Sequence, residues 1–236
     1  MPISDTDDIK RNELKYRINP ADSEILRARL GAIMQHDPHA APHPWYTVRS
    51  LYFDNAEDDL VNSKMNGERV RSLYRIRAYN GGSSPLYLER KTKTGLLVSK
   101  RRRRISEKEY SRATAVGLRR RPGGENAWTL EDEFSSDAGF LMLRPVSLVE
   151  YRREAFVCPS LEVRVTLDTC LRAAPGSRPL FGEAVRFQRL FPDDVIILEI
   201  KYRRFLPDFI SGMLSMTNRP RIAISKYTLC RAYGPA

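Results

Sequence analysis

The sequence predicts an α+β fold: an antiparallel β-sheet with helices packed on its outside and one strongly charged face. Several segments alternate apolar and charged residues with the two-residue period of a strand. Stretches with helix-capping signals lie between them. The formal net charge of +11 is concentrated where strands are predicted. A sheet with one apolar face and one charged face accounts for all three observations.

Helices are expected to cover the apolar face of this sheet. Ser106 and Glu109 form a capping box, which predicts a helix that starts there and extends to residue 118. Further helices are predicted over residues 22–34, 55–64 and 207–216, and residues 130–143 are ambiguous. These segments supply enough helix to cover an outer surface.

The strands are predicted at residues 13–16, 74–78, 86–91, 161–168 and 196–202. In each one, side chains of Lys, Arg, Glu or Asp share a face opposite apolar residues. The charged faces carry Glu-x-Lys at Glu13/Lys15, Glu89/Lys91 and Glu199/Lys201, and Arg-x-Arg at Arg75/Arg77. Two arginines that are two residues apart on a strand repel each other unless a polyanion lies between them.

The excess positive charge is local. Residues 69–104 contain twelve Lys or Arg and a single acid, Glu89, so they account for the whole net charge of +11. The remaining residues contain 28 basic and 28 acidic side chains. This local excess of positive charge indicates an anion-binding element rather than a surface that binds partners nonspecifically.

The 236 residues are sufficient for one large domain with a packed core, expected over residues 1–236 with residues 1–10 as a flexible tail. The sequence has no apolar run of about 18 residues, so we expect no membrane-spanning helix. The acidic, polar start predicts no secretory signal. Cys158, Cys170 and Cys230 form no CxxC pair, which favours a reduced, cytoplasmic protein.

Two arrangements of the strands compete. One is an open sheet whose charged face meets water, where mixed charges are ordinary. The other is a barrel whose apolar faces point outward onto helices and whose charged faces point into a shared interior. The barrel is favoured by polar faces rich in Arg, Lys and Glu, by the available helices, by the three Glu-x-Lys pairs and by Arg75/Arg77.

These segments resemble the VTC domain, the polyphosphate polymerase domain of the vacuolar transporter chaperone complex and of free-standing bacterial proteins, within the triphosphate tunnel metalloenzymes. The resemblance runs in the family's order from residue 11 to residue 227, through RNELKYRI, RSLYFDN, LYRIRAY, LYLERKTKTGLLVSKRRRR, VEYRREAF, LEVRVTLDT, VILEIKY and ISKY. It implies an antiparallel β-barrel that forms a charged tunnel for ATP and inorganic polyphosphate, with Mn²⁺ or Mg²⁺ as cofactor.

The resemblance also implies the site residues. The phosphate-binding residues would be Lys15, Arg75, Arg77, Lys91, Lys100, Arg153, Arg164, Lys201 and Lys226. The catalytic residues would be Arg75, Arg77, Lys91, Arg164 and Glu199. Glu199 matches the family's metal-binding glutamate, and Glu89 and Glu162 are further candidates. Eukaryotic polymerase domains carry a second lysine where this chain has Ala223, and Arg221 is a candidate substitute.

The chemistry of the residues agrees with a polyphosphate ligand. A chain with about one negative charge per phosphoryl unit needs donors spread along a channel; Arg offers a bidentate fork and Lys a compact charge. An empty channel of cations would repel itself, so it should contain interleaved acids, here Glu13, Glu89, Glu162 and Asp168, or bound anions.

The implied reaction transfers the γ-phosphoryl group of ATP to the end of a polyphosphate chain. A triphosphatase at the same site, a non-catalytic polyphosphate-binding subunit and an RNA-binding protein are the alternatives, and the sequence lacks the aromatic-plus-basic strand motif of the last. Export of a product would require a membrane-protein partner, which would place the protein at the inner face of a membrane. The sequence does not indicate an oligomeric state.

Other features have simpler interpretations. In residues 100–104, alternation puts Lys100, Arg102 and Arg104 on the tunnel side, and Arg101 and Arg103 outside as a solvated face or a docking site for long polyphosphate. Residues 119–121 are expected in a solvated loop, and Tyr16, Tyr52, Tyr151 and Tyr202 in the core. His36, His39 and His43 are expected in a loop without metal. The common nucleotide-binding and hydrolase motifs are absent.

Overall fold

The computed structural model describes residues 12–40, 42–95, 97–115, 129–182, 185–191, 195–214, 219–223 and 225–234. The predicted tail at residues 1–10, the loop at 119–121 and the end of the helix predicted to reach residue 118 lie outside these ranges. The strands are β1 (Asn12–Ile18), β2 (Gln35–His36), β3 (Trp45–Asp54), β4 (Val70–Tyr79), β5 (Leu86–Thr94), β6 (Leu97–Ile105), β7 (Arg144–Cys158), β8 (Val163–Pro175), β9 (Gln188–Arg189) and β10 (Ile196–Tyr202). The helices are α1 (Pro20–Gly31), α2 (Asp59–Met65), α3 (Glu107–Thr114), α4 (Leu130–Phe140), α5 (Asp208–Leu214) and α6 (Lys226–Tyr233), with short 3₁₀ turns at Pro38–Ala40 and Pro159–Leu161.

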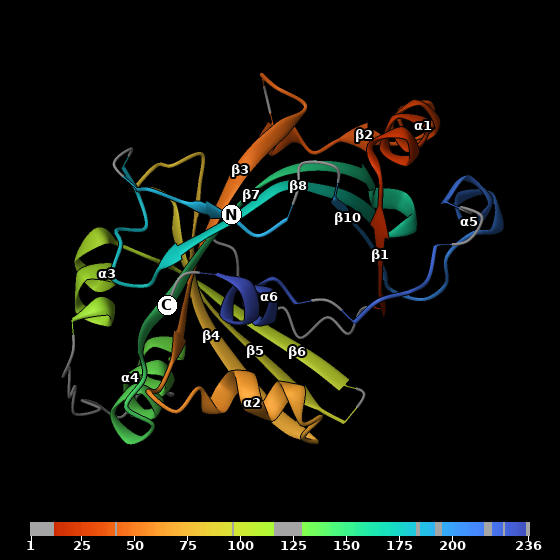
Figure 1. Cartoon of the computed structure of the whole chain (residues 1–236). Helices are drawn as coiled ribbons and strands as arrows, with labels where there is room; N and C mark the ends of the chain where they lie inside the picture. The colour runs from red at the N-terminus through yellow and green to blue at the C-terminus, as the bar shows by residue number, and fades with distance from the viewer. Residues whose placement is uncertain are drawn as a thin grey trace.

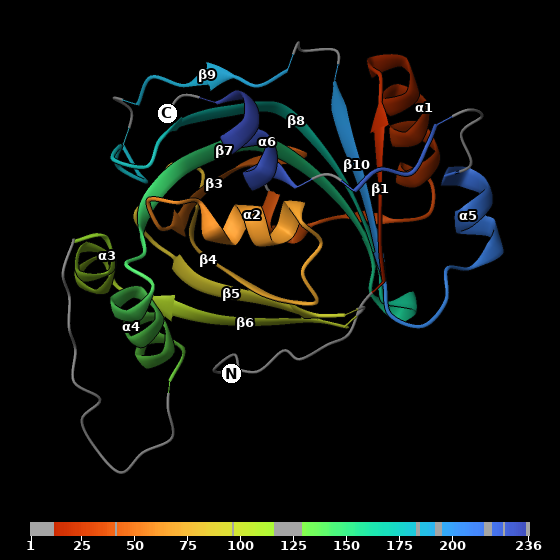
Figure 2. The ribbon, with the colours of Figure 1, turned by 60° about the horizontal axis from the view of Figure 1, so that its bottom comes forward.

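All strands belong to one antiparallel sheet. Its order is β1-β10-β8-β7-β3-β4-β5-β6, with β2 beside β7 and β9 beside β8. The sheet is strongly curled, so that the β1 end turns toward the β5–β6 end (Figures 1 and 2). An ion pair of 3.5 Å between Lys91 on β5 and Glu13 on β1 links the two ends. The prediction of an α+β fold with a barrel-like antiparallel sheet is confirmed, in the form of one strongly curled sheet.

The outer, convex face of the sheet is apolar and covered by helices. Around β8 and β10, the buried side chains pack with Leu26 and Leu30 of α1 and with Ile210 of α5. Around β3 to β6, they pack with Leu130 and Phe134 of α4. Each fully buried Leu contributes about 1.5–3 kcal/mol relative to an exposed one. The apolar half of the alternation therefore holds the helices in place.

Two helices lie on the concave face, contrary to the prediction that all helices pack outside. Figure 2 shows α2 and α6 within the curve of the sheet. Tyr227 of α6 stacks on Tyr52 of β3 with ring centroids 4.8 Å apart, and Val61 of α2 joins the same buried cluster. The physical reason is that part of the inner face is apolar and aromatic, so it needs its own cover.

Local signals set the helix ends. Asn19, Ser106 and Thr129 each form a capping box, which confirms the predicted start of α3 and resolves the ambiguous stretch as the helix α4. The helix α1 begins earlier than predicted because Asn19 caps it, with Pro20 in its first turn. The helix α2 begins later than predicted because the Asp54 carboxylate accepts the Leu60 N–H at 2.9 Å and the Val61 N–H at 3.0 Å.

Among the described helices, none is both long and apolar enough to cross a lipid bilayer.

Candidate functional site

The concave face, termed the inner face below, carries charged residues in rows that run across neighbouring strands. Residues directly opposite each other on antiparallel strands point to the same side. The rows are Glu13–Lys201–Arg164, Lys15–Glu199–Thr166, Arg153–Asp168 and Arg75–Glu89–Arg102, with Lys91 opposite Lys100. Antiparallel register therefore brings together cations and carboxylates that are far apart in the sequence.

Glu89 is the centre of the first cluster. Its carboxylate, 1% exposed, accepts a hydrogen bond of 2.7 Å from Arg75 Nε and another of 2.7 Å from Lys100 Nζ. Arg77 Nη1 and Arg102 Nε each lie 3.7 Å from Oε1. Burial opposes ionisation of Glu89, but Arg77, Arg75 and Lys100 hold its pKa well below the usual range. One carboxylate thus separates the two arginines that were expected to repel each other.

Glu199 is the centre of the second cluster. Its carboxylate is 5% exposed and forms ion pairs with Lys201 and, at 3.8 Å, with Lys15. Lys15 also lies 2.7 Å from Glu13. Burial works against the charge on Glu199, but Lys201, Lys15 and Arg153 keep its pKa well below its ordinary value. The Glu199 carboxylate is therefore ionised at neutral pH.

Asp168 is the centre of the third cluster. Arg153 donates two hydrogen bonds to it, from Nε at 2.7 Å and from Nη2 at 2.8 Å, and Lys226 Nζ lies 2.5 Å away. Both Arg153 and Lys226 also lie over the ring of Tyr151, at 5.2 and 4.6 Å from its centroid. Lys226 is the first residue of α6, so this helix contributes a cation to the inner face.

Arg164 lies at the edge of this arrangement. It is opposite Lys201 in the register of β8 and β10. Its guanidinium pairs with Asp37 and donates a hydrogen bond of 2.9 Å to the hydroxyl of Tyr46. The side chain is 31% exposed, whereas that of Arg153 is 10% exposed. Arg164 is therefore held in place by an acid that sequence reasoning did not consider.

A known protein family matches the chain over nearly its whole length. The VTC domain family model matches residues 10–233. The chain belongs to the VTC domain family. The match covers nearly the whole chain, as the sequence resemblance implied, and no curated protein sequence matches.

A solved structure shares the fold of this VTC domain at low identity. A Hippeastrum protein, described as a candidate adenylyl cyclase with a dominant triphosphatase activity, is 15% identical with a TM-score of 0.53, covering 95% of this chain and 96% of that chain. A candidate adenylate cyclase from Bacillus halodurans is 12% identical with a TM-score of 0.46, covering 86% of each chain. At 15% identity, the Hippeastrum protein establishes the similarity of fold only.

The structure places most of the predicted residues of this VTC domain on the inner face. The three acid-centred clusters and the Glu13 pair contain Lys15, Arg75, Arg77, Lys91, Lys100, Arg153, Lys201, Lys226 and Glu199. Arg164 shares the face but has its own acid, Asp37. Arg221, the candidate substitute near Ala223, is exposed and donates a hydrogen bond of 3.3 Å to the backbone oxygen of Glu13.

The prediction that Glu162 is an interleaved inner acid and a candidate metal ligand is wrong. Glu162 precedes β8, in a turn where its φ is +51°, and it is exposed. Its carboxylate pairs with Arg203 at 3.0 Å. The strand starts at Val163, so the alternation that would have turned Glu162 inward does not extend to it.

The alternation predicted for residues 100–104 is confirmed, but the prediction of a solvated outer pair is wrong. Lys100 and Arg102 face Glu89 on the inner side. Arg101 pairs with Glu133 of α4, and Arg103 pairs with Glu131 at 2.7 Å. The outer arginines attach the acidic first turn of α4 to the sheet, where negative charge is also favoured by the helix dipole.

Sequence reasoning missed Lys64 of α2. Its ammonium donates a hydrogen bond of 3.1 Å to Thr228 Oγ1 of α6, and no carboxylate of the described residues forms an ion pair with it. Burial, reinforced by Lys15, Lys91 and Arg71, lowers the pKa of Lys64 to about 8. No strand alternation flags this residue, because it lies on a helix that the curl of the sheet encloses.

Glu199 fits the divalent cation that the VTC resemblance implies. Its Oε1 is buried, and among the described residues only the Lys201 ammonium contacts it, in an ion pair that a divalent cation would replace. Mg²⁺ binds through one or two carboxylates, with phosphate oxygens and water in the remaining positions. Glu89 fits less well, because four cations surround it. No group of three or more acidic, His or Cys side chains gathers anywhere in the described part of the chain, so a cation here depends on ligand oxygens.

Proposed function

We propose that the protein is a metal-dependent polyphosphate polymerase that transfers the γ-phosphoryl group of ATP to inorganic polyphosphate along the inner face. The observation that carries the proposal is the excess of cations over acids on this face. Apart from the Arg164–Asp37 pair at its edge, the described part of this face has ten basic side chains and four carboxylates: Lys15, Lys64, Arg75, Arg77, Lys91, Lys100, Arg102, Arg153, Lys201 and Lys226 with Glu13, Glu89, Asp168 and Glu199.

The ion pairs prepare these cations for a polyanion. Each acid holds two or more basic side chains near the inner face without a ligand. A phosphate chain offers more negative charge than the four acids, so the flexible Lys15, Lys91 and Lys100 can turn from carboxylate to phosphate. The arginines offer forks that bind two oxygens of one phosphoryl group. Since the side chains of Arg77 and Arg153 are 9% and 10% exposed, these contacts are little screened by water.

Glu199 would hold Mg²⁺ or Mn²⁺ together with phosphate oxygens, displacing Lys15 and Lys201 from its carboxylate. The bound cation would supply Lewis-acid stabilisation of charge on the transferred phosphoryl group. Arg75 and Arg77 would bind the phosphoryl oxygens and orient the acceptor chain in line with the bond that breaks. No general base is required, because the terminal oxygen of the acceptor polyphosphate is already ionised.

A triphosphatase acting at the same face is the second candidate. It is favoured by the fold shared with the Hippeastrum protein, for which triphosphatase activity is described. The two activities would use the same phosphate-binding side chains and differ in the acceptor. Attack by a polyphosphate oxygen lengthens the chain, whereas attack by water releases free phosphate.

The test is incubation of the purified protein with ATP and Mn²⁺ or Mg²⁺, scoring ADP, acid-insoluble polyphosphate and free phosphate together. Chain growth supports the polymerase, and free phosphate without growth supports the triphosphatase. Glu199→Gln should abolish either activity while triphosphate binding persists, and removal of the metal with a chelator should do the same.

A matched pair of variants separates the inner face from general positive charge. Arg102 and Arg103 are neighbours on β6, and the first faces Glu89 while the second faces α4. Arg102→Ala should weaken triphosphate binding, whereas Arg103→Ala should leave it near the wild-type value. Equal losses in both variants, with both folded by circular dichroism, would contradict the assignment to the inner face.

A further inference from the structure

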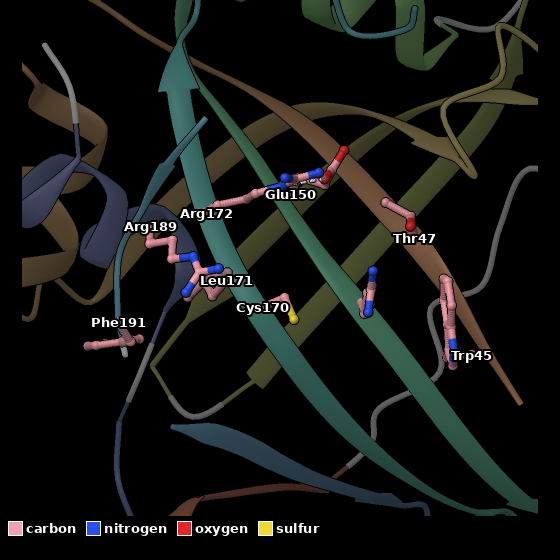
Figure 3. Close-up of a pocket in the computed structure, with 9 residues that line it drawn as sticks. Trp45, Thr47, Glu150, Cys170, Leu171, Arg172, Arg189 and Phe191 are labelled. Atoms are coloured by element: carbon pink, nitrogen blue, oxygen red, sulfur yellow. Dashed lines mark hydrogen bonds and ion pairs between the residues drawn. The ribbon is translucent and has the colours of Figure 1, made fainter. Parts of the chain in front are cut away.

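A second concentration of arginines lies away from the inner-face clusters. A pocket of about 220 Å³ lies where β3, β7, β8 and β9 meet, and Figure 3 shows its lining. The register of β7 and β8 shifts between Glu150 and Arg152, and Cys170 opposite them has φ of +52°. This irregularity opens the space. The pocket is lined by strand residues and Phe191, with no residue of the helices.

The pocket lining is positively charged. Among the described residues, Arg152 and Arg172 line it with one carboxylate, Glu150, and Arg189 lies at its β9 side. Glu150 is 3% exposed and already accepts hydrogen bonds from two arginines, Arg49 on β3 and Arg172 at 2.6 Å. Figure 3 shows Arg172 and Glu150 pointing toward one another. One buried carboxylate thus balances only half of the guanidinium charge that touches it.

The ring of Trp45 in the pocket wall already has two stacking partners. Trp45 has the guanidinium of Arg152 over its ring at 4.6 Å, and the ring of His43 stacks on it at 5.4 Å. A nucleobase would have to displace one of them. The polar donors that Arg152, Arg172 and Thr47 bring to the lining are guanidinium N–H groups and a hydroxyl, which suit the oxygens of a small anion.

We infer that this pocket binds a small multivalent phosphate anion, inorganic phosphate or diphosphate, as a site separate from the inner face. The separation follows from strand alternation: Arg152 and Arg153 are neighbours on β7, and Arg153 points to the opposite side, where it binds Asp168. The inference does not depend on the proposed function. The inference rests on the shape of the pocket, the positive charge of its lining and the forked guanidinium groups of its arginines.

Cys170 provides a local reporter of the pocket. Its thiol is exposed and lies in the lining, so a bound anion should shield it from N-ethylmaleimide, a neutral reagent that does not itself compete for the arginines. The experiment measures the rate of Cys170 labelling by peptide mass spectrometry with and without diphosphate. Diphosphate at ten times its Kd should slow labelling about tenfold, since about nine-tenths of the sites are then occupied.

Two comparisons make the result specific. The double variant Arg152→Gln/Arg189→Gln should lose the protection, whereas Arg178→Gln, an exposed arginine outside the pocket, should keep it. Arg75→Ala should also keep it, which separates the pocket from the inner face. Labelling of Cys158, which does not line the pocket, should be unaffected.

The inference is overturned if diphosphate leaves Cys170 labelling unchanged up to millimolar concentration. It is overturned equally if protection persists in the double variant, or if sodium chloride at matched ionic strength protects as well as diphosphate. Loss of protection in Arg75→Ala would instead assign the effect to the inner face. Diphosphate and orthophosphate arms then establish which phosphate anion the pocket prefers.

Discussion

Lys226, the first residue of α6, has its ammonium 2.5 Å from the carboxylate of Asp168 on β8. The same carboxylate accepts two hydrogen bonds from Arg153 of β7, and its side chain is 0% exposed. Burial opposes ionisation, but Arg153 and Lys226 keep the pKa of Asp168 below its usual value. A helix near the end of the chain and two central strands are thus joined by one buried charge cluster, which ties the position of α6 to the inner face.

Asp168→Asn should destabilise the protein by about 3–5 kcal/mol, because it leaves two buried cations without a counter-charge. Urea unfolding measures the loss. Triphosphate should restore part of the stability, since an anion between Arg153 and Lys226 replaces the carboxylate.

The control for this variant is Glu162→Gln. Glu162 also pairs with an arginine, but the two side chains are 42% and 49% exposed. Exposed pairs contribute about 0–1 kcal/mol, so this variant should unfold close to the wild type. Equal destabilisation by the two substitutions would show that the Asp168 cluster adds nothing beyond an ordinary ion pair.

Tyr227→Phe should cost about 1 kcal/mol in stability and raise the KM for triphosphate. The hydroxyl of Tyr227 donates a 2.5 Å hydrogen bond to Asp54, which joins α6 to the end of β3. Asp54 keeps its bonds from the backbone N–H groups of Leu60 and Val61, so only one bond is lost. The higher KM follows because the preceding residue in the chain, Lys226, is then held less firmly in position.

Tyr233 on the same helix provides the comparison, as its side chain is exposed. Tyr233→Phe should change neither the urea midpoint nor the KM. A wild-type KM in Tyr227→Phe, with the expected loss of stability, would mean that α6 stabilises the fold without positioning Lys226.

The strands β1, β4, β5, β8 and β10 were predictable because each carries its own alternation, whereas β3 and β7 were not predicted. Arg75 and Glu89 could be placed on charged faces from their own neighbours, but their pairing required the register of β4 and β5, which no single segment encodes. The eight residues of α6 form a helix against Tyr52 and Asp54, far away in the sequence, so local periodicity gave no sign of it. The prediction for Glu162 was wrong because local periodicity indicated a strand that the structure does not have there. The alternating pattern continued into residues that form a turn with positive φ.

Glu89→Gln should destabilise the protein about as much as Asp168→Asn. Four cations point at this carboxylate, which is 1% exposed. Removing its charge should cost about 3–5 kcal/mol. A loss below 1 kcal/mol in urea unfolding, at low salt and without phosphate, would contradict the central role of Glu89.

The same variant should alter acid stability. The folded-state pKa of Glu89 lies well below 4.5, its ordinary value, because Arg77, Arg75 and Lys100 outweigh the effect of burial. Glu89 therefore stabilises the fold fully above about pH 4.5, and that contribution is lost as the pH falls toward the folded-state pKa. Between pH 5 and pH 3, the thermal unfolding midpoint of the wild type should fall more steeply than the midpoint of Glu89→Gln.

Triphosphate affinity should decrease as the pH rises from 6 to 9, with Lys100 as a main cause. Burial, with Arg77 and Arg75, lowers the pKa of Lys100 to about 7, against the attraction of Glu89. Lys100 is 40% exposed, so solvent screens part of this effect. A phosphate ligand favours the charged ammonium, so binding raises the pKa and takes up protons. Above pH 7 the protein must first acquire a proton, and affinity declines.

Lys100→Arg isolates this contribution, because arginine stays charged throughout the range. Calorimetry of triphosphate binding in two buffers of different ionisation enthalpy measures the protons taken up near pH 7.5. The wild type should take up more protons than Lys100→Arg, and the decline of its affinity with pH should be steeper. Titration of the ligand is common to both proteins and cancels in the difference. Identical proton uptake by the two proteins would place Lys100 outside the phosphate-binding set, and the remaining pH dependence would then fall to Lys64, whose pKa is lowered to about 8 by burial and by Lys15, Lys91 and Arg71.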